Sequence, residues 1–61
     1  MTTYSIFCRF LLTGNEQIVE TYKTGLKYHL FERISELEST TFRDLIVELV
    51  ARDAQGNRVF P

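Results

Sequence analysis

The sequence predicts an α+β protein: one small antiparallel sheet of three or four strands, in the order ββαββ, with one helix packed on one face. Two segments near the start are rich in aromatic and β-branched residues and flank a Gly-Asn pair. A central segment repeats apolar residues at helical spacing. A third β-rich segment then runs into strong turn residues. We expect all 61 residues to form a single domain.

The first two strands are expected to form a hairpin. The segment YSIFCRFLL, from Tyr4 to Leu12, predicts a strand because it has many β-forming residues and no helical stripe. TGNEQ follows it, and we expect Gly14 to adopt the positive φ of a type II′ turn. The segment QIVETYK, residues 17–23, then predicts the returning strand.

A two-residue loop at Gly14-Asn15 would set the register of this hairpin. It places Arg9 opposite Glu20, which is a favourable ion pair across two strands. It also places Phe7 opposite Tyr22, a favourable aromatic pair. The agreement of both pairs with one loop length supports the predicted hairpin.

The segment TGLKYHLFERISELES, from Thr24 to Ser39, predicts the helix. Thr24 is a suitable N-cap, because its side-chain oxygen can accept a hydrogen bond from a free backbone N–H. Four apolar residues form one stripe along the helix: Leu26, Leu30, Ile34 and Leu37. We expect this stripe to pack on the sheet.

Residues 42–54 fit two interpretations. The spacing Thr41-x-x-Asp44 resembles a capping box and supports a helix. Six of the seven residues in 45–51 are apolar, which is more than a surface helix needs, and several are β-branched. DAQGN then supplies turn chemistry before a last β-like run. We favour a strand, and a helix remains the alternative.

The alternation of side chains predicts two apolar faces on this sheet. The face expected to meet the helix carries Tyr4, Ile6, Cys8, Phe10, Leu12 and Val19. The opposite face, called here the outer face, is expected to carry Phe7, Leu11, Ile18 and Tyr22, with Arg9 and Glu20 among them. One helix can cover only one face, so we expect a second chain to cover the outer face.

Composition limits the classes of function. Seven basic and eight acidic residues give a net charge of −1 and are interspersed, which disfavours nucleic-acid binding without excluding it. No apolar run is long enough for a membrane helix, and the N-terminal residues do not resemble a secretory signal. The one cysteine allows no disulfide within the chain, which fits a reducing cytoplasm.

Few residues suit catalysis or metal binding. Cys8 and His29 are the only residues of their types, and we expect Cys8 to be buried and inert in the middle of a strand. One cysteine and one histidine are too few for a zinc site of the usual ligands. We therefore expect no catalytic residue, no metal and no cofactor.

The sequence thus favours a small interaction or regulatory protein that is not an enzyme. It is expected to work through an apolar sheet face or edge, as a homodimer or bound to a protein partner, in the cytoplasm. The predicted contact residues are Phe7, Arg9, Leu11, Ile18, Glu20 and Tyr22. The alternative is weak binding of single-stranded nucleic acid on the same face, with aromatic rings stacking on bases.

Overall fold

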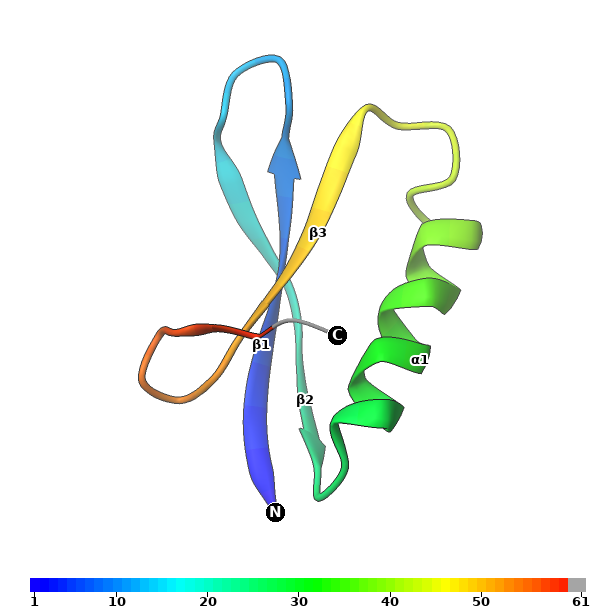
Figure 1. Ribbon diagram of the computed structural model, residues 1–61. Coiled ribbons are helices and arrows are strands. Elements are labelled where there is room, and N and C mark those ends of the chain that lie inside the picture. Colours follow the sequence, from blue (N-terminus) through cyan, green and yellow to red (C-terminus); the bar gives the residue numbers. More distant parts are fainter. Residues whose placement is uncertain (60–61) are drawn as a thin grey trace.

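The computed structural model describes residues 1–59, which form a four-stranded antiparallel sheet and one α-helix (Figure 1). The elements are β1 (Thr2–Phe10), β2 (Glu16–Thr24), α1 (Lys27–Ser39), β3 (Val47–Arg52) and β4 (Arg58–Val59). The strand order in the sheet is β2-β1-β3-β4, so β1 lies between β2 and β3. This arrangement confirms the predicted α+β class and the ββαββ order.

The ambiguous segment contains a strand, as we favoured. β3 begins at Val47, whereas Leu45 and Ile46 lie in bends before it. After β3 the chain turns tightly, because Asp53 Oδ1 accepts hydrogen bonds from the backbone N–H groups of Gln55 (2.9 Å) and Asn57 (3.0 Å). This turn chemistry, and not the capping pattern upstream, decides the local structure.

The hairpin exists, but its predicted register is wrong. The connection comprises residues 11–15 and is closed by Phe10 N–H donating to Asn15 O (2.8 Å) and Gly14 N–H donating to Phe10 O (2.7 Å). Arg9 therefore lies opposite Glu16 and not opposite Glu20. The register shifts again between Ile6 and Phe7. An irregularity of this kind changes which residues face the core.

The new register moves Tyr22 to the helix side of the sheet. Tyr22 lies opposite Tyr4, which is buried, and packs against the core cluster together with Val19. The placement of Tyr22 on the outer face was therefore wrong. Phe10 and Leu12 were expected in the core, but β1 ends at Phe10 and Leu12 is 85% exposed in the connection to β2.

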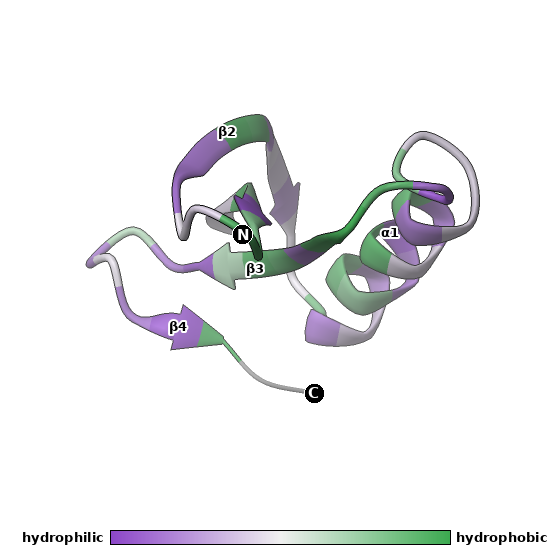
Figure 2. Ribbon diagram, turned by 90° about the horizontal axis from the view of Figure 1, so that it is seen from above, coloured by the Kyte–Doolittle hydropathy of each residue, from purple (hydrophilic) through white to green (hydrophobic). Residues whose placement is uncertain are grey.

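The core lies between α1 and the inner side of the sheet (Figure 2). Its buried members are Tyr4, Ile6, Leu30, Leu37 and Ala51. Cys8 is also buried, as predicted from its place in β1.

The helical stripe is only partly confirmed. Leu30 and Leu37 are buried and Ile34 packs against the core, but Leu26 is 59% exposed. Leu26 occupies the N-cap position in an extended conformation and has no side-chain cap. Thr24 is therefore not the N-cap; its hydroxyl accepts a hydrogen bond from Leu26 N–H (3.1 Å) one step before the helix.

Candidate interaction surface

The register divides the predicted contact residues among three places. Phe7 and Ile18 lie opposite each other on the outer face, next to Arg9 along the strand. Glu20 and Tyr22 lie toward the helix, and Leu11 lies in the connection between β1 and β2. The six residues therefore do not form one patch.

On the outer face the ring of Phe7 lies under the Arg52 side chain, whereas Ile18 opposite it is 54% exposed. The guanidinium carbon of Arg52 lies 5.1 Å from the centre of the Phe7 ring, within the range of a cation–π contact. Arg52 also forms a two-pronged ion pair with Glu16, which lowers the pKa of that carboxyl. Val50, opposite Phe7 on β3, is only 2% exposed. This face is thus less open than the sequence predicts.

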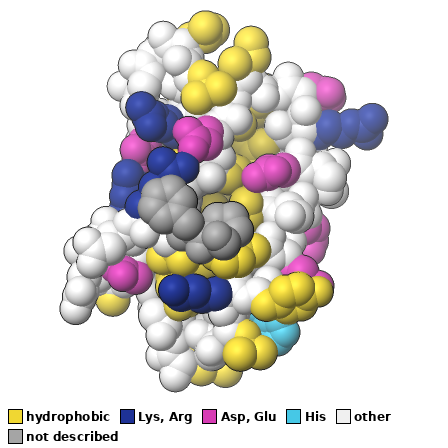
Figure 3. All heavy atoms as spheres, in the orientation of Figure 1, with side chains coloured by type: hydrophobic (Ala, Val, Ile, Leu, Met, Phe, Trp, Pro, Cys, Tyr) yellow, Lys and Arg dark blue, Asp and Glu magenta, His cyan; other side chains and the backbone are white. Residues whose placement is uncertain are grey.

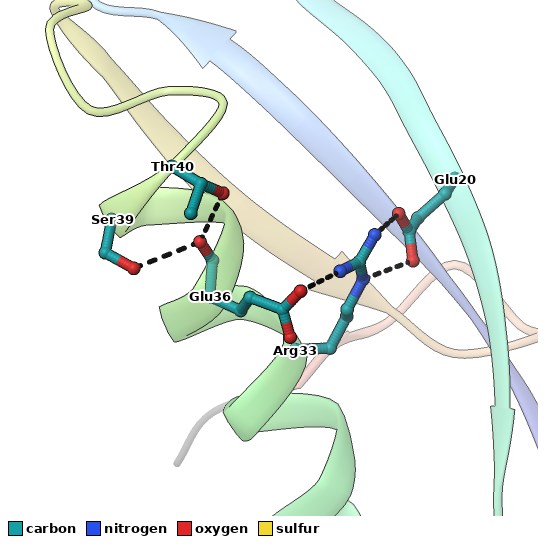
Figure 4. A network of polar contacts seen from close by, with 5 residues as sticks. All are labelled: Glu20, Arg33, Glu36, Ser39 and Thr40. Carbon is teal, nitrogen blue, oxygen red and sulfur yellow. Dashed lines mark hydrogen bonds and ion pairs between the residues drawn. The ribbon is translucent and has the colours of Figure 1, made fainter.

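Glu20 joins β2 to the helix (Figure 4). Its carboxylate accepts hydrogen bonds from Arg33 Nε (3.0 Å) and Arg33 Nη2 (2.8 Å), and Arg33 Nη1 donates to Glu36 (2.8 Å). The hydrogen bonds from Arg33 lower the pKa of Glu20. The predicted Arg9–Glu20 pair is therefore replaced by a contact between layers of the fold.

The largest set of exposed apolar side chains lies at one end of the molecule. We call it the apolar tip: Phe10, Leu11, Leu12, Leu45 and Ile46. Their exposed fractions are 38%, 54%, 85%, 54% and 64%, respectively. Figure 3 shows hydrophobic side chains gathered at the end where, in Figure 1, the β1–β2 and α1–β3 connections lie.

One backbone hydrogen bond joins the two connections of the apolar tip, and others order each connection. Leu11 N–H donates to Ile46 O (3.3 Å), which joins residues far apart in sequence. Leu45 N–H donates to Phe42 O (3.3 Å), and the β1–β2 connection is closed by the bonds at Phe10 described above. The exposed side chains are therefore carried on an ordered backbone.

The apolar tip contains an open hollow of about 560 Å³. Its walls are mainly apolar, and Thr13, Asn15 and Asp44 contribute the polar groups. Leu12, one of the residues that line it, is the most exposed member of the tip. The site thus combines a projecting side chain with a concave apolar surface.

A second hollow, of about 630 Å³, lies between α1 and β3. Its apolar walls include Phe31, Ile34, Phe42, Leu49 and Val59, and all five are half-buried and pack against the core. Side chains that already pack in this way have less area to offer a partner than those of the apolar tip. We therefore take the apolar tip as the candidate interaction surface.

Sequence reasoning missed the apolar tip because it assigned Phe10 and Leu12 to the core and extended the third strand back to Leu45. A signal was present in the sequence. Leu11-Leu12 immediately precedes Thr13-Gly14, and Leu45-Ile46 follows a charged pair after the helix. Apolar pairs beside turns lie where a sheet cannot bury them, because connecting segments run over the surface.

Groups that could carry chemistry are few in the described part of the chain. Burial raises the pKa of the Cys8 thiol, which disfavours the reactive thiolate. His29 is exposed on α1 with its ring 5.8 Å from that of Tyr28. Within residues 1–59 no three His, Cys, Asp or Glu side chains are grouped to hold a metal. The helix α1 is neither long nor apolar enough to cross a membrane.

Comparison with protein-family models, with curated proteins and with solved structures finds no match for this chain.

Proposed function

We propose that this chain is a small interaction or regulatory protein without catalytic activity, which binds a protein partner or a second copy of itself through the apolar tip. The proposal rests mainly on the exposure of five large apolar side chains at the end of β1 and on two connections that a backbone hydrogen bond joins. Of the residues predicted from sequence, Leu11 lies in this surface. A cytoplasmic location belongs to the same proposal, since the single cysteine is buried and forms no disulfide.

The size of the apolar tip supports this proposal. If each side chain offers roughly 150–200 Å² when fully exposed, near the lower end of the aromatic range, the exposed fractions of the five give on the order of 500 Å². The largest patch on a typical monomer is about 300–600 Å² and is often functional. Covering such an area contributes roughly 10 kcal/mol before the costs of association are subtracted.

The alternative function, weak binding of single-stranded nucleic acid, has one observation in its favour. The strand register places four basic side chains and two carboxylates on the outer face: Arg9, Lys23, Arg52, Arg58, Glu16 and Glu48. Arg52 lies over the Phe7 ring and pairs with Glu16, while Arg58 pairs with Glu48. Because these pairs offset the charge and cover the ring, we rank this function second.

The experiment is a pull-down from native lysate with three baits: wild type, Leu12→Glu and Leu26→Glu. Leu26 is a matched control, because it is an exposed leucine at the N-cap of α1. In Figure 1 the start of α1 lies at the opposite end of the helix from the α1–β3 connection. We expect a protein, or untagged copies of the chain, to be retained by wild type and Leu26→Glu and lost with Leu12→Glu. If nothing retained depends on Leu12, the proposal is wrong. Retention that nuclease abolishes supports the alternative.

A further inference from the structure

We propose that the partner at the apolar tip is a second copy of this chain, related by a two-fold axis, with Leu12 of each copy inserted into the hollow of the other. This inference rests on the proposed function, because it names the occupant of the same surface. Three features of the apolar tip support it: its shape, its rim charges and its area.

The apolar tip carries both an exposed side chain and a hollow that could receive the same side chain of a second copy. Leu12 is 85% exposed and is itself one of the apolar residues that line the hollow, with Phe10, Leu45, Ile46 and Val47. A two-fold interface brings the same patch of both copies together, so each copy supplies one projection and one hollow. A surface that carries both features can therefore be closed by its own copy.

The charges at the rim are also self-complementary. Arg43 and Asp44 are exposed next to Leu45, and neither side chain forms an ion pair within residues 1–59. A two-fold contact can bring Arg43 of one copy toward Asp44 of the other. A partner of one charge sign would instead repel one of the two. Asp44 also lines the hollow, so closing the tip would cover an unpaired carboxylate unless Arg43 of the other copy pairs with it.

The area fits a weak dimer. Two tips of on the order of 500 Å² each bury about 1,000 Å² in total, at the lower limit for a specific interface. A chain of 61 residues gains stability from oligomerisation, because it buries a small share of its own surface. We therefore expect a dimer that dissociates on dilution.

The first test is sedimentation equilibrium over a wide concentration range. Wild type and Leu26→Glu should move from the monomer mass of 7.2 kDa toward twice that mass as concentration rises. Leu12→Glu should remain a monomer over the whole range. Far-ultraviolet circular dichroism must show that each variant keeps the wild-type helix signal; Ile46→Lys provides a second tip variant if Leu12→Glu fails to fold.

The second test mixes two variants. Leu12→Glu and Ile46→Lys should each be monomeric, because each self-contact would bury one introduced charge in each hollow against an apolar side chain of the other copy. Mixed together, they should form a heterodimer visible by native mass spectrometry, since one hollow then receives an opposite-charge pair and the other keeps Leu12 against Ile46. Absence of the heterodimer at concentrations where wild type dimerises overturns the proposed two-fold arrangement.

The outcomes separate this inference from the proposed function. If wild type stays monomeric while a different protein is captured in a Leu12-dependent way, the second copy is wrong and the proposed function stands. If wild type dimerises and Leu12→Glu dimerises equally well, the apolar tip is not the contact surface and the inference is wrong. If, in addition, no captured protein depends on Leu12, the proposed function is wrong as well.

Discussion

Arg33 of α1 donates two hydrogen bonds to the carboxylate of Glu20 in β2, from Nε at 3.0 Å and from Nη2 at 2.8 Å (Figure 4). The two side chains are only 31% and 26% exposed. The two parallel hydrogen bonds hold the guanidinium in one orientation, in addition to the attraction between the opposite charges. This contact joins the helix to the edge strand of the sheet and gives Glu20 an ion-pair partner other than Arg9, which lies opposite Glu16.

We expect Glu20→Gln to destabilise the fold. The neutral amide presents one acceptor and one donor to two guanidinium donors, so the paired contact is lost. The change should lower the Tm by a few degrees, since partly exposed ion pairs contribute modestly in a domain of this size. Thermal unfolding followed by circular dichroism measures it. Glu36→Gln is the control: Glu36 is 64% exposed and shares one bond with Arg33, so its effect should be smaller. Equal effects would refute this assignment.

Acid should weaken the fold partly through Glu16 and Glu20. Hydrogen bonds from Arg52 and Arg33 lower the pKa values of these carboxyls below the ordinary 4.5. The unfolded chain therefore takes up protons at a higher pH than the folded chain. The stabilisation is complete above 4.5 and is lost as pH falls toward and through the lower folded values.

Urea unfolding between about pH 6 and pH 3 measures this dependence. The double variant Glu16→Gln with Glu20→Gln should start with a lower urea midpoint and lose less of it on acidification. Other carboxyls titrate equally in both proteins, so the difference between the two curves isolates this pair. Parallel curves would show that neither ion pair contributes.

Segments with strong local chemistry could be predicted from the sequence. The β-branched residues Val47 and Val50, followed by the Asp53 turn, decided the strand in an ambiguous segment, and the structure confirms it. The alternation of apolar residues in β1 predicts that Tyr4, Ile6 and Cys8 face the core, and all three are buried. These predictions succeed because backbone preference and burial pattern agree there.

The register and the apolar tip could not be predicted from the same rules. The Gly-Asn pair indicates a turn but does not say which backbone groups close it, and the bonds at Phe10 make the connection longer than two residues. The shift between Ile6 and Phe7 then reassigns Tyr22 to the core side. Leu12 was placed on the core face for a different reason, because the predicted strand continued to residue 12 whereas β1 ends at Phe10.

Arg52 should protect the outer face from water. In Arg52→Ala the ring of Phe7 loses its covering group and Glu16 loses its partner. We expect a lower urea midpoint and more binding of a hydrophobic dye than wild type shows. Arg52→Lys is the matched control, because lysine keeps the charge and an apolar stem but lacks the planar guanidinium. The decrease in its urea midpoint should therefore be intermediate. If Arg52→Ala has the urea midpoint and the dye binding of wild type, other groups cover Phe7.

Substitution by alanine should destabilise the fold more at Gly56 than at Gly25. Its φ is +84°, in the left-handed region, whereas Gly25 has no positive φ, and an added Cβ at either position meets no atom within 4 Å. Gly56→Ala should therefore cost about 1–2 kcal/mol through backbone strain alone. Gly25→Ala should be neutral or slightly stabilising, because it restricts the unfolded chain. Urea denaturation of both variants checks this, and a Gly56→Ala variant as stable as Gly25→Ala would exclude strain in the β3–β4 turn.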